Sequence, residues 1–169
     1  MTDTTASSLP DDFKVPAFFV ADHAVVENGK VYVNGGFFNR IYQVAYPTQI
    51  SIAVVSLVEV PYTELLQDHR FAVEMLDAEK KKLPAPVRIE GGFRLAPAPD
   101  SRVGEPTMMP LAISLDGLSL ERAGDYWFVF FINDNEMASY HMRVEQVGVI
   151  QHPLQPPTPA GGSGGAQEE

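Results

Sequence analysis

The side chains that could carry out acid–base or metal chemistry are few, and their spacing keeps them apart. The chain has four histidines, His23, His69, His141 and His152. Asp22 precedes His23 on a segment with strand periodicity. Because neighbouring residues of a strand point to opposite faces of a sheet, these two side chains cannot form a catalytic dyad there. His141 and Glu145 would share a face, but four residues at about 3.3 Å each put their Cα atoms roughly 13 Å apart, too far to ligate one metal. His69 lies on a connection, where a lone histidine is an ordinary surface residue, and His152 lies in a Pro-rich tail that we expect to be solvated.

Three other motifs lack the context that their chemistry needs. Residues 161–165 read G-x-S-x-G, but a nucleophile elbow needs a strand before the serine and a helix after it. Asn133–Glu136 offers oxygen ligands that calcium favours, yet the same composition is typical of a tight turn between strands. Asn34–Gly36 is Gly-rich without a following helix, which favours a bend in a strand. Since cysteine is also absent, the sequence predicts no catalytic residues, no cofactor and no enzyme activity.

The elements that must position these side chains are strands. Apolar residues recur at every second position along most of the chain, with turn residues between the runs. Asn28-Gly29 separates two such runs and is the pair best suited to a type I′ hairpin turn. Only residues 63–68 invite a helical turn. The pattern predicts eight strands, over residues 17–27, 30–37, 49–60, 70–76, 87–95, 107–115, 126–132 and 137–147.

Composition sets the domain boundaries and excludes several function classes. Residues 1–16 are small and polar, and residues 148–169 are Pro-rich and then Gly-rich, so we expect both to be disordered around a domain at 17–147. The chain has 12 Lys and Arg against 22 Asp and Glu, a net charge of −10, which argues against nucleic acid as a partner. No apolar run approaches the roughly 20 residues that cross a bilayer, and no secretory signal opens the chain. We expect a cytoplasmic protein without a membrane partner.

One segment indicates which class of β-sandwich the chain forms. Ala123-Gly124-Asp125 leads directly into Tyr126 and an apolar strand, which resembles the tyrosine corner of immunoglobulin-like and fibronectin-like sandwiches. The Tyr hydroxyl of that motif bonds to the backbone a few residues upstream. Phe128 occupies the position that carries a cysteine in antibody domains. The predicted fold is an all-β, immunoglobulin-like antiparallel sandwich of about eight strands.

The runs FFVADHAVVENGKVYVNGGFF at 18–38 and AGDYWFVFFINDNEMASYHMRVE at 123–145 also resemble an uncharacterised family of bacterial β-sandwich proteins, classed as a domain of unknown function. The resemblance covers most of the domain. It implies a fold but no activity, because the family has no assigned catalytic residues.

The strand at 126–132 carries apolar side chains on both faces. One face packs into the core, while Trp127, Val129 and Phe131 point the other way, where a solvated strand face should be polar. A hairpin about the Asn133–Glu136 turn places this stripe beside His141 and Arg143. An aromatic stripe bordered by polar residues is typical of a contact surface. These five residues are the predicted binding site.

Several interpretations of the stripe remain open. The chain could cover it with the N-terminal arm, with residues 61–69 or with the C-terminal tail. Otherwise it is an intermolecular surface of a protein-interaction or assembly module, self-association first, and a homodimer would also cover the long apolar run at 50–58. The alternative is a small-ligand or carbohydrate-binding sandwich with Trp127 and Phe131 as a stacking platform. A hydrolase would need two or more of Asp22, His23, Asp68, His69 and His141 to converge in one pocket.

Overall fold

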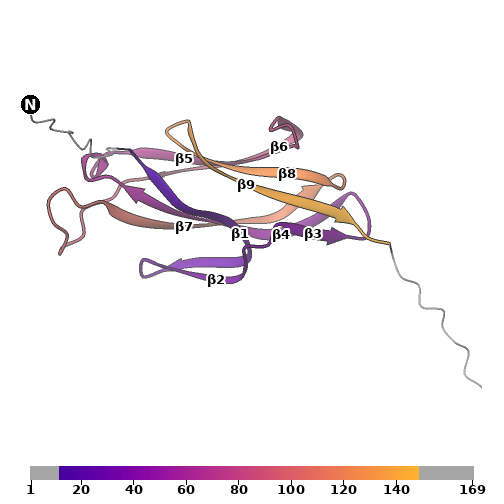
Figure 1. The fold of residues 1–169 in the computed structure, drawn as a ribbon, viewed down its shortest axis with the longest axis horizontal. Helices are drawn as coiled ribbons and strands as arrows, with labels where there is room; N and C mark the ends of the chain where they lie inside the picture. The colour runs from indigo at the N-terminus through magenta and orange to yellow at the C-terminus, as the bar shows by residue number, and fades with distance from the viewer. Residues whose placement is uncertain (1–11, 149–169) are drawn as a thin grey trace, which may run out of the picture.

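The computed structural model describes residues 12–148, and within them the chain forms a sandwich of two β-sheets (Figure 1). The four-stranded sheet has the order β2-β1-β4-β7 and the five-stranded sheet the order β3-β9-β8-β5-β6. An all-β sandwich is therefore confirmed. The strands are β1 (Lys14–Glu27), β2 (Lys30–Gly36), β3 (Arg40–Gln43), β4 (Thr48–Val60), β5 (His69–Leu76), β6 (Lys82–Phe93), β7 (Thr107–Leu120), β8 (Gly124–Ile132) and β9 (Asn135–Gln146).

All eight predicted strands are present, and a ninth, β3, was missed. It is only four residues long, too short for its periodicity to be recognised. It also pairs with β9 in parallel, whereas every expected pairing was antiparallel. The predicted helical turn is a 3₁₀ turn at Tyr62–Glu64, and no helix of residues 12–148 is long and apolar enough to cross a bilayer.

Several strands extend beyond their predicted ends. β1 begins at Lys14, whose ammonium group lies 2.8 Å from the carboxylate of Glu59 on β4, so residues 14–16 are part of the sheet. β6 begins at Lys82 and includes Pro84 and Pro86, which its position at the edge of the sheet tolerates. Residues 1–11 and 149–169, where we predicted most of the two tails, lie outside the described residues.

The main core lies between the two sheets. Val20 and Val54 from the four-stranded sheet meet Phe128, Phe130 and Met142 from the five-stranded sheet, and all five are essentially inaccessible to water. Each such side chain contributes about 1.5–3 kcal/mol to folding through burial. This core explains the inward face of β8.

The four-stranded sheet is apolar on its outer face as well. Phe19, Ala21, Ala53 and Val55 alternate with the core residues and form a second buried cluster together with Ala24. Ala24 belongs to the distal part of β1, which leaves β4 after Ala21 and pairs only with β2. We call this two-stranded segment, residues 22–36, the ribbon. In Figure 1 its strand β2 lies beneath β1 and β4, on the side away from the five-stranded sheet.

Backbone geometry at its two ends sets the course of the ribbon. Asn28 and Gly29 have φ of 51° and 73°, as the predicted type I′ turn requires. At the other end Gly35 has φ of 62°, and a Cβ there would collide with the Asp22 carboxylate. The predicted bend at Asn34–Gly36 is thus present, and it requires glycine.

Candidate functional site

The predicted aromatic stripe lies on the outer face of β8, but it is only partly accessible. Trp127 and Phe131 are half-buried, and Val129 has 0% of its surface exposed. Trp127 lies opposite His141 on β9 and opposite Leu76 on β5. The structure therefore brings the predicted residues together but leaves Val129 unable to touch a partner directly.

Cationic side chains of the chain itself cover the stripe. Lys80 Nζ lies 5.0 Å from the centroid of the Trp127 ring, and the Glu136 carboxylate holds it at 3.0 Å. The Arg88 guanidinium lies 5.7 Å from the centroid of the Phe131 ring. Long cationic chains commonly cover aromatic faces in this way, with the stem on the ring and the charge in contact with water. Within residues 12–148 this cover comes from the β5–β6 hairpin, which differs from all three segments that we considered.

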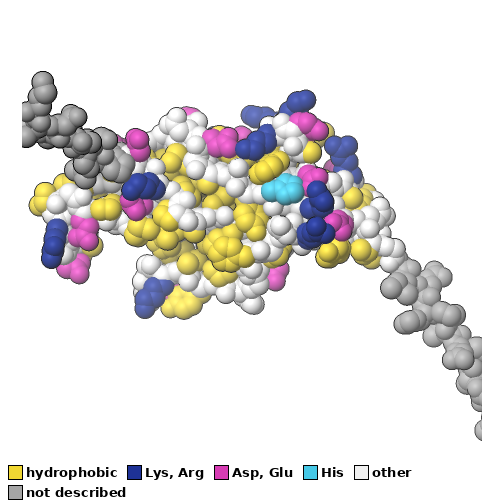
Figure 2. Space-filling view, viewed as in Figure 1, with side chains coloured by type: hydrophobic (Ala, Val, Ile, Leu, Met, Phe, Trp, Pro, Cys, Tyr) yellow, Lys and Arg dark blue, Asp and Glu magenta, His cyan; other side chains and the backbone are white. Residues whose placement is uncertain are grey.

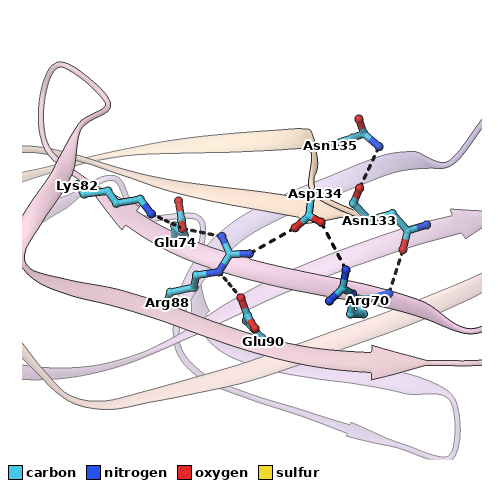
Figure 3. Close-up of polar contacts among 8 residues, drawn as sticks. All are labelled: Arg70, Glu74, Lys82, Arg88, Glu90, Asn133, Asp134 and Asn135. Carbon is cyan, nitrogen blue, oxygen red and sulfur yellow. Dashed lines mark hydrogen bonds and ion pairs between the residues drawn. The ribbon is translucent and has the colours of Figure 1, made fainter.

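Arg88, whose guanidinium lies over Phe131, is the centre of an ion-pair network (Figure 3). Its guanidinium contacts the carboxylates of Glu90 and Glu74, the latter at 2.6 Å, and lies 3.7 Å from Asp134. The hydrogen bonds to Glu90 and then Glu74 raise the pKa of Arg88, while Arg88 lowers the pKa of Glu90. Glu74 is buried, 7% exposed, so Arg88 neutralises a carboxylate that would otherwise be desolvated without a partner.

His141 and Arg143 are both held by one carboxylate. His141 Nε2 lies 2.8 Å and Arg143 Nε 2.9 Å from Oδ1 of Asp125. Arg143, followed by His141, lowers the pKa of Asp125, and Asp125 raises the pKa of Arg143. The His141 ring lies 4.9 Å from that of Trp127. The two predicted polar residues thus belong to the local ion-pair structure of this face.

Among the other histidines, the interpretation of His69 as a surface residue was wrong. It is 5% exposed; its Nε2 lies 2.9 Å from the Glu64 carbonyl oxygen and its Nδ1 3.1 Å from the Asn133 amide nitrogen. His69 is the first residue of β5 and not part of a connection, and the rings of Phe13 and Phe93 pack against it. Residues 12–148 contain no group of three or more His, Asp or Glu side chains placed to hold a metal. His152 and the serine motif at 161–165 lie outside the described residues.

The ribbon exposes more apolar surface than the stripe does, and sequence reasoning did not single it out. Val25 is 46% and Tyr32 52% exposed on one face of the ribbon, while Val26, Val31 and Val33 are 37–40% exposed on the other. The signal was present, because apolar residues occupy consecutive positions on both sides of Asn28-Gly29. It is visible only once β1 is known to leave the sheet. Figure 2 shows hydrophobic side chains gathered over the middle of the molecule down to the edge where β2 lies in Figure 1.

The model of a family of unknown function, DUF6941, matches residues 16–145. The chain belongs to this family. Comparison with curated proteins gives no match. Among solved structures, the chain is similar to Pseudomonas fluorescens alkylpurine DNA glycosylase AlkC bound to DNA containing an abasic site analog, with 9% identity and a TM-score of 0.36 over 75% of this chain and 30% of that one. A likeness this weak carries no argument about fold or activity.

Membership of DUF6941 assigns no residue a role, so the site has to be judged by geometry. Two surfaces stand out: the covered stripe on the five-stranded sheet, and the ribbon beside the four-stranded sheet. The five predicted binding residues all belong to the first. The apolar side chains of the second are more exposed, and fewer charged groups border them.

Proposed function

We propose that this domain is a non-enzymatic protein-interaction or assembly module, and that it makes its contacts through the ribbon. The observation that carries the proposal is the exposure of Val25 and Tyr32, 46% and 52%, on a strand pair that has no further strand of residues 12–148 beside it. A two-stranded hairpin alone is marginally stable in water. Contiguous exposed apolar side chains of this kind mark contact surfaces.

The ribbon is a better contact surface than the stripe on which the sequence prediction rested. Val129 offers no accessible surface, and a partner reaching Trp127 would have to displace Lys80 from its ring and from Glu136. The same contact disfavours the carbohydrate alternative, since a stacked sugar needs an open ring face. The ribbon requires no such displacement.

Strand order supports an immunoglobulin-like relationship for the sandwich. The orders β1-β4-β7 and β9-β8-β5 match strands A-B-E and G-F-C of that fold. The Tyr126 hydroxyl donates a hydrogen bond of 2.8 Å to the Arg122 carbonyl, as a tyrosine corner would. In this interpretation β2 and β3 are additions between strands A and B.

Site-specific photocrosslinking tests the proposed function. A photoreactive amino acid replaces Tyr32 in the full chain, expressed in its natural host, and a control replaces Val103, an 88% exposed loop residue. We expect ultraviolet-dependent protein adducts, to the chain itself or to a partner, at position 32 and not at position 103. Equal adduct yields at both positions, or none at either, would overturn the proposal.

A further inference from the structure

We propose that the partner of the ribbon is a second copy of this chain, whose β2 pairs antiparallel with β2 about a two-fold axis at Tyr32. The inference rests on the proposed function and names its partner. Pairing would join two ribbons into a continuous sheet of the order β1-β2-β2-β1. The strand edge, the residue register and the charges each favour it.

The hairpin turn determines which backbone groups β2 presents at its free edge. A two-residue turn makes Glu27 and Lys30 a hydrogen-bonded pair, and such pairs alternate along an antiparallel ladder. Tyr32, opposite Val25, therefore bonds back to β1. The N–H and C=O groups of Val31 and Val33 point outward, at the edge of the sheet.

Other long free edges in residues 12–148 carry residues that discourage pairing. β6 contains Pro84 and Pro86, and β7 contains Pro110, each of which removes a backbone donor. β2 contains no proline, and all seven of its residues are exposed. It is thus the edge best able to accept another strand.

An axis at Tyr32 matches side chains across the new ladder. Val31 lies opposite the partner's Val33, and each such pair exchanges two backbone hydrogen bonds, giving four about the axis. Tyr32 lies opposite the partner's Tyr32. One face then carries the row Val25–Tyr32–Tyr32–Val25, and the other carries Ala24–Val33–Val31–Val26, so every apolar residue of the ribbon meets an apolar neighbour.

Charge permits pairing through β2, and the apolar rows select this register. The chain has a net charge of −10, so two copies can meet only where acidic groups stay apart. With the axis at Tyr32, Lys30 lies opposite the partner's Asn34, and no acid faces an acid across the junction. Moving the axis to Val33 places Tyr32 opposite Asn34, and moving it to Val31 places Lys30 opposite Tyr32. Both shifts break the apolar rows.

Disulfide trapping tests the register directly, because the chain has no cysteine of its own. In Tyr32→Cys the two thiols would face each other with Cβ atoms about 4.5–5.5 Å apart, close enough to bond after a small adjustment. In the matched control Val25→Cys, on the same face, three strand spacings of about 4.8 Å separate the thiols by roughly 14 Å. We expect a covalent dimer of twice the mass under mild oxidation from Tyr32→Cys and at least tenfold less from Val25→Cys.

A second pair of variants keeps the test independent of oxidation. Tyr32→Lys places two ammonium groups across the axis and should weaken the dimer at least tenfold in a light-scattering concentration series, whereas Val25→Lys should leave it within about threefold. Circular dichroism checks that all variants are folded. Equal trapping at positions 25 and 32, or a wild-type chain that stays monomeric throughout the series, overturns the inference. If photocrosslinking at position 32 still captures another protein, the proposed function survives that failure; if position 32 yields no adducts at all, both fail.

Discussion

The two outer faces of the sandwich meet the same problem, an apolar sheet surface facing water, in different ways. On the five-stranded sheet, Lys80 and Arg88 cover the aromatic stripe, and ion pairs with Glu136 and Glu74 hold them in place. On the four-stranded sheet, a segment of the chain itself, the ribbon, covers Ala53 and Val55. Its residue Ala24 packs in one buried cluster with them. Side-chain cover leaves a charged surface. The ribbon buries the second apolar cluster but exposes apolar side chains of its own. This difference is why we propose that the domain associates through the ribbon.

The largest expected effect is on the second buried cluster. Val55→Asp puts a carboxylate where 2% of the side chain is exposed, with apolar neighbours that cannot pair with it. We expect a loss of about 3 kcal/mol or more in the free energy of unfolding, measured by urea titration. A loss below about 1 kcal/mol would mean that the ribbon does not cover this face in solution.

The next effect concerns the ion pair under the other cover. Among the described residues, Arg88→Met leaves Lys82, 3.9 Å away, as the one counter-charge of the buried Glu74, and it should lower the free energy of unfolding by about 2 kcal/mol. Adding Glu74→Met to this variant removes the desolvated carboxylate and should restore most of the stability, as measured in the same titration. A double variant no more stable than the single one would show that Arg88 acts through packing on Phe131 alone.

A smaller effect is expected from the cover of Trp127. Lys80→Ala removes the cation above the indole and one surface ion pair. The free energy of unfolding should therefore fall by at most about 1 kcal/mol. Trp127 is the chain's one tryptophan, and its emission should shift to longer wavelength as water reaches the ring. Lys81→Ala, in the same turn, is the control and should leave the emission unchanged. A shift of equal size in both variants would contradict the cover.

The smallest effect is on the acid limb of stability. The pKa values of Asp125 and Glu90 are lowered in the folded chain, so the folded state binds fewer protons than the unfolded state near those values. Their contribution is complete above the ordinary carboxyl range, about pH 4, and is lost as pH falls through the lowered values. Arg143→Gln removes the main cause of the lowered Asp125 pKa. The free energy of unfolding should then fall less steeply as pH decreases below about 4. Arg102→Gln, a loop variant on a side chain outside the ion pairs found in residues 12–148, should leave this slope unchanged.

Sequence periodicity was sufficient for eight of the nine strands and for the inward face of β8, because alternation is local. It correctly put Phe128 and Phe130 in the core and the bend at Gly35. It could not provide the cover of the stripe, because that depends on β5 lying next to β8, a pairing between segments about 55 residues apart along the chain. It missed β3 for lack of length. It recognised the hairpin of β1 and β2 but could not show that β1 leaves the sheet after Ala21, since the apolar pattern continues unchanged through that point.

The left-handed backbone at Gly35, with the Asp22 carboxylate filling the space beside it, has a mechanical consequence. The direction of the ribbon is fixed by φ angles and by atoms in contact, and the chain on both strands would have to bend together to change it. Two domains linked through their ribbons would therefore meet at a fixed angle. The orientation of one domain would then determine the orientation of the other.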